Sequence, residues 1–233
     1  TTFVPCLKIG ITTKEIAARR SFVLLVSHLA RQFADSKSVH LYGDLKCLIR
    51  DDDQDLDFFL NVTHVQVHRR AKAFSRLRRL LSAHDDSADQ SPLFSDQSFG
   101  NILLPLAMHP VYEYKSKIEE AYVIESIATV GEISKHLPWS KYNNTLQSVL
   151  NSLGRYPDQE RYLIAMLCAI IDAFHFSVDT GEETANNNNE VESSQGNGVW
   201  RTLKNRILPK VESFLIKEVD KHGSKVKRLR SSV

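Results

Sequence analysis

The residues best suited to chemistry are six bases between positions 64 and 81, a segment without any acid. Four of them follow the i, i+3, i+7, i+10 spacing that places side chains on one stripe of a helix: Arg69, Lys72, Arg76 and Arg79. A second, apolar stripe through Phe74 and Leu77 would face a core. Guanidinium groups in a row suit the phosphates of an RNA backbone, because each makes bidentate charge-assisted bonds. The pattern predicts an RNA-contacting helix; the alternative is a solvated face that pairs with acids at 51–57.

Two further sets of bases belong to this prediction. Arg70 lies next to the stripe, and the C-terminal tail carries Lys225, Lys227 and Arg228. The tail fits a nuclear or nucleolar address or an RNA-contacting extension. It equally fits bases that complement the dipole of a preceding helix. The candidate RNA- or partner-binding residues are Arg69, Arg70, Lys72, Arg76, Arg79, Lys225, Lys227 and Arg228.

Residue patterns for metals and catalysis are incomplete. The five acids at 51–57 resemble a calcium loop, but Leu56 stands where glycine is needed and Val62 where a bidentate glutamate is needed. His64 and His68 have the spacing of a zinc protease pair without the glutamate between them. Phosphate-binding glycine loops, a nucleophile elbow and CxxC pairs do not occur. We therefore expect no enzyme, cofactor, metal site or small-molecule substrate.

Composition favours a helical protein. The chain has 233 residues, is 42% hydrophobic, and holds only 9 Gly and 7 Pro. The net charge of +2 conceals an acidic stretch at 177–198 with five acids and no base, so the remainder is basic and suits an anionic partner. Three dispersed cysteines fit a reducing intracellular compartment. No apolar run approaches about 18 residues, so we expect no membrane span, and a start without methionine suggests a piece of a longer protein.

Apolar spacing predicts a succession of helices separated by short connections. The connections contain Pro110, Pro138 and Pro157, and Thr13 is the expected N-cap of the first helix. The expected helices are 13–33, 64–81, 99–108, 117–136, 138–153, 157–174 and 200–219, with shorter apolar stretches at 39–49 and 58–62. The expected organisation is N-terminal repeats at 1–83, two helix pairs at 98–176, a disordered acidic and asparagine-rich insert at 177–198, a further repeat helix at 199–220 and a basic tail at 221–233.

A repeated leucine–proline element indicates helical repeats. Residues 102–106 and 206–211 share an apolar pair, a proline and another apolar residue, and Pro105 and Pro209 lie 104 residues apart. Leu146 occupies the same role 41 residues beyond Pro105, and 41 residues remain between Leu146 and Pro209 once the 22-residue insert is subtracted. A period of about 40–47 residues is typical of HEAT and armadillo repeats. The predicted fold is therefore an all-α, α–α superhelix.

Residues 55–71, which read from Asp-Leu-Asp-Phe-Phe-Leu to His-Arg-Arg-Ala, resemble a signature of the "down-regulated in metastasis" family. This is the family of the large helical-repeat protein twenty of the U-three small nucleolar ribonucleoprotein. Residues 101–106, 137–142 and 174–176 resemble further family elements in the same order, so the resemblance covers about residues 40–216. It implies a nucleolar α-solenoid of the small-subunit processome, with pre-ribosomal RNA and U-three ribonucleoprotein proteins as partners and a role in producing small-subunit ribosomal RNA.

Two other functions remain open from the sequence. An importin-like or armadillo-like adaptor would hold peptides in a groove lined with regularly spaced asparagine and tryptophan, but Trp139 and Trp200 do not show such an interval. A regulatory helical domain would serve catalytic residues elsewhere on a longer chain. The preferred expectation is a non-enzymatic scaffold of the small-subunit processome.

Overall fold

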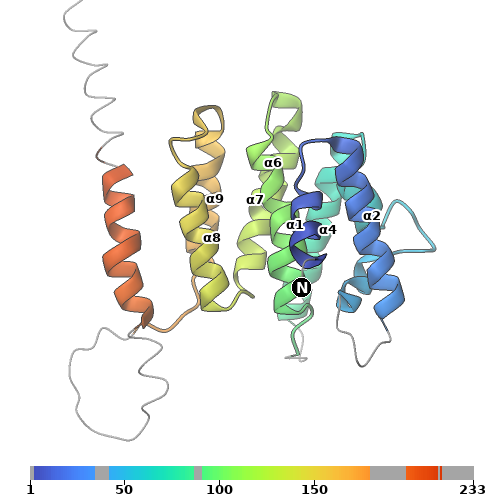
Figure 1. Cartoon of the computed structure of the whole chain (residues 1–233), viewed down its shortest axis with the longest axis horizontal. Coiled ribbons are helices and arrows are strands. Elements are labelled where there is room, and N and C mark those ends of the chain that lie inside the picture. The colour runs from blue at the N-terminus through green and yellow to red at the C-terminus, as the bar shows by residue number, and fades with distance from the viewer. Residues whose placement is uncertain (1–2, 35–41, 87–90, 179–197, 215, 217–233) are drawn as a thin grey trace, which may run out of the picture. The chain divides into compact units, whose positions relative to one another are not determined.

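The computed structural model describes residues 3–34, 42–86, 91–178, 198–214 and 216, and every regular element among them is a helix. The chain divides into two compact units, Thr1–Phe174 and His175–Val233. The longer helices of the first unit stand side by side in Figure 1. Its elements are α1 (Phe3–Ile11), α2 (Ile16–Phe33), η1 (Gly43–Leu48), α3 (Phe58–Val62), α4 (Val67–Asp85), α5 (Asp96–Ser98), η2 (Phe99–Leu103), α6 (Leu104–Tyr112), η3 (Lys117–Glu119), α7 (Glu120–Ser134), α8 (Trp139–Ser152), η4 (Pro157–Gln159) and α9 (Glu160–Asp172). The prediction of an all-α fold is confirmed for the described residues.

The first two helices form a hairpin whose start differs from the prediction. The N-cap of α2 is Glu15 and not Thr13, because the Glu15 carboxylate accepts hydrogen bonds from the backbone N–H groups of Ala17, at 3.1 Å, and Ala18. Ile16 is exposed as a result. Helix α1 was not predicted. It packs against α2 at Gly10, where an added Cβ would lie 2.3 Å from the Phe22 ring, so the close approach of these helices requires a glycine.

Helices α4 and α7 pack against each other and run in the same direction. Along α4, Phe74 stacks on Tyr122 with ring centroids 5.7 Å apart, and Arg78 pairs with Glu125 farther along. At the ends of the two helices Asp85 meets His136. The residues thus meet in increasing order on both helices, so α4 and α7 are parallel neighbours.

The same parallel relationship recurs between later helices at a nearly constant sequence separation. Glu120 of α7 accepts hydrogen bonds from Arg161 and Tyr162, the second and third residues of α9, which lie 41 and 42 residues later. Tyr112 at the end of α6 contacts Ser152 at the end of α8, 40 residues later. Contacts between α7 and α9 and between α6 and α8 thus join residues separated by close to the predicted 41 positions, whereas contacts between α4 and α7 join residues 47 to 51 positions apart.

The two leucine–proline elements share an unusual local backbone. In η2, Leu104 N–H bonds to the Phe99 carbonyl five residues back, directly before Pro105. Residues 198–214 of the second unit are helical, and in η5 (Leu203–Ile207) the N–H of the next residue bonds five residues back, directly before Pro209. A wider turn at this place relieves the clash between the proline ring and the preceding turn of helix.

The remaining expectations have different outcomes. Pro110 was predicted to lie in a connection, but it lies inside α6, which continues to Tyr112. The insert at 177–198 lies almost wholly, and the tail at 221–233 wholly, outside the described residues. Among the described helices none is both long and apolar enough to cross a bilayer. Cys6, Cys47 and Cys168 are free and exposed.

Candidate nucleic-acid interface

The basic helix predicted at 64–81 is α4, shifted toward the C-terminus. The His64 ring nitrogen Nδ1 accepts a hydrogen bond from Gln66 N–H at 3.0 Å, so the chain turns before the helix begins at Val67. His64 and His68 therefore do not share a helical face, and their resemblance to a zinc pair has no structural basis. Desolvation, and then the positive charges of Arg69 and Arg20, lower the pKa of His64 below its usual value of 6.5.

Two bases of the predicted stripe turn toward the acidic segment that precedes the helix. The Arg69 guanidinium pairs with the Asp55 carboxylate at 2.7 Å. Arg76 donates a hydrogen bond to the Asp55 backbone carbonyl. This is the pairing that the sequence analysis named as the alternative to RNA contact, and it occupies half of the stripe.

The acidic segment at 51–57 holds its shape through its own hydrogen bonds. Asp57 is buried and caps α3, because its carboxylate accepts from Leu60 N–H at 2.8 Å and from Arg50 N–H at 3.2 Å. Asp53 accepts from Asp55 N–H at 2.8 Å, which closes a tight turn. The Asp55 carboxylate, which pairs with Arg69, therefore belongs to an ordered loop.

Arg70 belongs to the packing between α4 and α7. Its guanidinium carbon lies 4.7 Å from the centroid of the Tyr122 ring, and a nitrogen lies 3.7 Å from the Glu119 carboxylate. The side chain is 18% exposed. A cation held over an aromatic ring and beside a carboxylate stabilises the helix interface, and this leaves Arg70 little surface for a phosphate.

Lys72 and Arg79 remain directed to solvent. Both are exposed, and within the described residues neither pairs with a carboxylate. The Arg79 Nε lies 3.4 Å from the Ser75 carbonyl of the same helix, so most of its guanidinium stays available. The tail bases Lys225, Lys227 and Arg228 lie outside the described residues. RNA contact by the basic helix stays a prediction, and Lys72 and Arg79 are the two bases of the predicted stripe that are exposed.

A second basic surface brings together helices that are distant in the sequence. Helices α1, α6 and α8 border a groove of about 610 Å³. Its charged lining consists of Lys8, Lys14, Lys141 and the single acid Glu113, and its polar lining includes Asn101, Tyr112, Asn144, Ser148 and Tyr156. Lys141 donates to the Asp96 carbonyl, whereas Lys8 lies exposed on α1. Lysines and amides along one groove suit an extended anionic chain.

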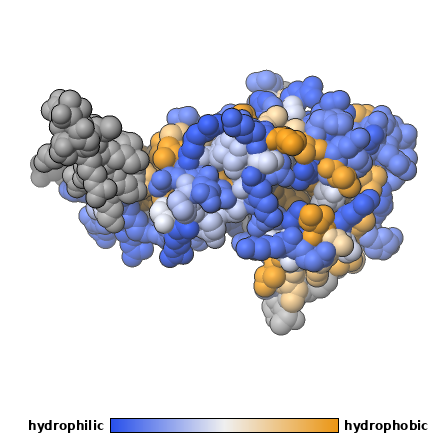
Figure 2. Space-filling view, turned by 90° about the horizontal axis from the view of Figure 1, so that it is seen from above, coloured by the Kyte–Doolittle hydropathy of each residue, from blue (hydrophilic) through white to orange (hydrophobic). Residues whose placement is uncertain are grey.

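One end of this groove carries two tyrosines. The rings of Tyr112 and Tyr156 meet edge to face, with centroids 5.4 Å apart, and Tyr156 is 41% exposed. Burial raises the pKa of Tyr112, whose hydroxyl lies 3.3 Å from the Ser152 hydroxyl. An exposed ring in a groove that lysines also line offers a stacking platform. In Figure 2, hydrophobic residues form separate patches among hydrophilic ones.

Sequence reasoning missed the groove because no local pattern marks it. Lys8 and Lys141 are separated by most of the first unit, and single lysines on helices are ordinary surface residues. The available signal was the 41-residue period. This period predicts that Gly100 and Lys141 lie on adjacent equivalent helices, and an added Cβ at Gly100 would indeed lie 3.0 Å from the Lys141 side chain.

Comparison with known proteins finds relatives of one kind. No family model matches the chain. It is 23% identical over 164 residues to "U3 small nucleolar RNA-associated protein 20" of Saccharomyces cerevisiae, which covers 70% of this chain and 6% of that protein. It is 23% identical over 210 residues to the protein of the same name from Schizosaccharomyces pombe, covering 90% of this chain and 8% of that protein. The chain therefore spans less than a tenth of the length of these relatives.

Proposed function

We propose that this chain is a non-enzymatic helical-repeat scaffold in the small-subunit processome of the nucleolus, where it supports the processing of pre-ribosomal RNA to small-subunit ribosomal RNA. The similarity to two proteins named for association with U3 small nucleolar RNA supports this role. The main structural support is the set of parallel helices that recur at 40–42 residues. In the proposal these pairs belong to a HEAT-like or armadillo-like α–α superhelix.

The helical architecture suits a scaffold because each pair buries its apolar face against the next. The central helix α7 packs against α4 on one side and α9 on the other, so charged side chains are left on the outer surfaces. We propose that Lys72 and Arg79 contact pre-ribosomal RNA, with the tail bases Lys225, Lys227 and Arg228 extending that surface. The partners would be this RNA and proteins of the U3 ribonucleoprotein. No step of this role requires catalysis, a metal or a cofactor.

A peptide-binding adaptor is the second candidate, favoured by the groove between α6 and α8. Asn101 of η2 and Asn144 of α8 line it, and asparagine amides can hydrogen-bond the backbone of an extended peptide. Its lysines would then select an acidic peptide.

The cellular experiment tags the chain in its own host cells and measures U3 RNA in the purified material. We expect enrichment of U3 RNA over an unrelated small nucleolar RNA. We also expect loss of small-subunit ribosomal RNA, with accumulation of its precursors, when expression is repressed. Absence of U3 enrichment together with normal precursor levels would overturn the scaffold proposal. Recovery of an acidic protein partner without either RNA effect would favour the adaptor.

A further inference from the structure

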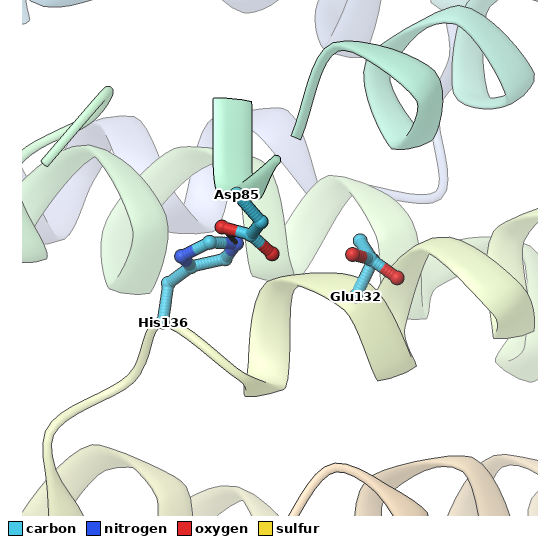
Figure 3. Close-up of side chains that lie close together, drawn as sticks. All are labelled: Asp85, Glu132 and His136. Atoms are coloured by element: carbon cyan, nitrogen blue, oxygen red, sulfur yellow. Dashed lines mark ion pairs between the residues drawn. The ribbon is translucent and has the colours of Figure 1, made fainter. Parts of the chain in front are cut away.

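Three potential metal ligands converge where α4 and α7 end. Asp85 is the last residue of α4, Glu132 lies in the last turn of α7, and His136 follows that helix. One ligand atom from each side chain lies within 4.8 Å of the other two. Figure 3 shows the His136 imidazole next to the Asp85 carboxylate, with the Glu132 side chain to one side on the helix that precedes His136.

We propose that Asp85, Glu132 and His136 bind a divalent transition-metal ion, with Zn²⁺ as the assigned ion, and that this ion joins α4 to α7. One imidazole nitrogen and two carboxylate oxygens are ordinary zinc ligands, and a water molecule would complete four-coordination. The nitrogen ligand favours a borderline cation over Mg²⁺ or Ca²⁺, which prefer oxygen alone.

The distance between the first two ligands already fits such an ion. The Asp85 Oδ1 and His136 Nε2 atoms lie 3.6 Å apart. Two ligands of a tetrahedral zinc, each bound at about 2.1 Å, lie about 3.4 Å apart. Of the three ligands, only the Glu132 carboxylate must then move toward the ion. It does so by a change of side-chain rotamer, because the backbone of Glu132 is fixed in α7.

The histidine is held with a nitrogen available for a ligand. Its ring stacks on Phe99, with centroids 5.3 Å apart and planes 3° from parallel. The His136 Nε2 atom is buried and has no hydrogen-bond partner within the described structure. A buried polar atom without a partner destabilises a fold, and a metal bond would satisfy this nitrogen.

The two helix ends also favour a cation, once the Lys135 ammonium has moved away from Glu132. Because α4 and α7 run parallel, the negative ends of both helix dipoles lie near the three ligands. Ser82 Oγ donates to Glu132 Oε1 at 3.2 Å and can keep orienting that carboxylate when the other oxygen binds an ion. Lys135 Nζ bonds both Glu132 oxygens, at 3.0 and 3.1 Å. Its side chain is 49% exposed and can move into solvent when the ion enters.

The proposed site is independent of the scaffold role, since it concerns only the joint between two helices. A metal ion that bridges α4 and α7 would hold the C-terminal ends of these two parallel helices together, away from the Phe74–Tyr122 contact. Removal of the ion would lower the melting temperature of the whole chain without changing its exposed bases.

The test uses the whole chain freed of metal with a chelator, followed by titration with Co²⁺ and Zn²⁺. We expect one ion per chain, visible absorption of bound Co²⁺, displacement by Zn²⁺, and a higher melting temperature with Zn²⁺. Asp85→Asn and His136→Gln should each weaken Zn²⁺ binding by at least about tenfold. His28→Gln, which removes an exposed histidine on α2, serves as the matched control and should leave the affinity unchanged.

Circular dichroism of the metal-free variants shows whether each variant folds. Asp85→Asn should disturb packing less than His136→Gln, because Asp85 is exposed. Equal Zn²⁺ affinity in Asp85→Asn, His136→Gln and His28→Gln would overturn the site, because binding would then come from scattered surface histidines. Binding of Ca²⁺ or Mg²⁺ as tightly as Zn²⁺ would overturn the assignment to a transition metal.

Discussion

The Arg69 guanidinium of α4 lies 2.7 Å from the carboxylate of Asp55, fourteen residues earlier in the chain. The two side chains are 34% and 67% exposed, so solvent screens the pair and its contribution to stability is at most about 1 kcal/mol. Its larger effect is on surface charge. The Asp55 carboxylate partly neutralises a stripe that would otherwise present four bases to a polyanion. Because Arg76 also bonds to Asp55, Lys72 and Arg79 are left as the exposed bases of the stripe.

Charge reversal at the exposed members should weaken RNA binding. In Lys72→Glu/Arg79→Glu the affinity for structured ribosomal RNA should fall, and the slope of log affinity against log salt should become shallower by about 0.7–0.9 per lost phosphate contact. Filter binding over a salt series measures both quantities.

The matched control is Lys8→Glu/Lys14→Glu, which reverses two charges in the groove between α1, α6 and α8. An unchanged slope in the α4 variant combined with a shallower slope in the groove variant would move the RNA surface from α4 to the groove. Unchanged slopes in both would remove RNA contact from these described surfaces.

Removal of the Asp55 carboxylate should have the opposite effect on RNA. Asp55→Asn keeps the size of the side chain and the carbonyl that Arg76 uses, but releases the Arg69 guanidinium from its ion pair. We expect tighter RNA binding and a steeper salt dependence, with a change in the free energy of unfolding below about 1 kcal/mol. A weaker affinity in this variant would show that the pair itself shapes the binding surface.

The contact between Phe74 and Tyr122 should dominate the joint between α4 and α7. Phe74 is fully buried, stacks on Tyr122 and meets Phe58 edge to face at 6.0 Å. Phe74→Ala should lower the free energy of unfolding by about 3–5 kcal/mol, since it removes apolar contacts and leaves a cavity. Urea unfolding measures the loss. Leu80→Ala, at a half-buried position on the same helix, should cost clearly less.

The close approach of α7 and α9 should depend on Gly131. An added Cβ would lie 3.1 Å from the Ala169 carbonyl oxygen and 3.3 Å from the Ala169 Cβ. Gly131→Leu should destabilise the chain by about 1–3 kcal/mol through overpacking. In Gly131→Ala the tight contact is offset by the better helix propensity of alanine, worth up to about 1 kcal/mol, so thermal melting should show a much smaller change. Equal effects of the two variants would contradict this packing.

Acid should destabilise the fold through His109. Burial, and then the neighbouring charge of Arg19, lower the pKa of His109 below 6.5, and Arg19 Nη1 lies 2.6 Å from its Nε2. The unfolded chain therefore binds more protons than the folded chain between the lowered pKa and 6.5. The free energy of unfolding should fall as pH drops below about 6.5.

Comparison of urea unfolding at about pH 7.5 and about pH 5.5 measures this effect. His109→Gln can still accept from Arg19 but does not titrate, so it should lose less stability between these two conditions than the wild type. An identical pH dependence in both proteins would exclude His109 as a source of the acid sensitivity.

Much of the architecture was readable from local patterns. The apolar spacing identified α7, α8 and α9 to within a few residues, and the distance from Pro105 to Leu146 anticipated the 40–42-residue offset between α6 and α8 and between α7 and α9. These features depend on helical periodicity and on proline chemistry, which each segment carries in its own residues. The predicted start of α2 was wrong, because both Thr13 and Glu15 can cap a helix. Only the folded backbone decides that Glu15 is the N-cap.

The candidate sites required the tertiary structure. A helical wheel places Arg69, Lys72, Arg76 and Arg79 on one stripe, but the return of the acidic segment onto α4 decides which of them stay exposed. Asp85 and His136 are 51 residues apart and meet only because α4 and α7 pack in parallel. Periodicity within a segment is a short-range property of the chain, whereas the convergence of side chains depends on how the segments bury their apolar faces against one another.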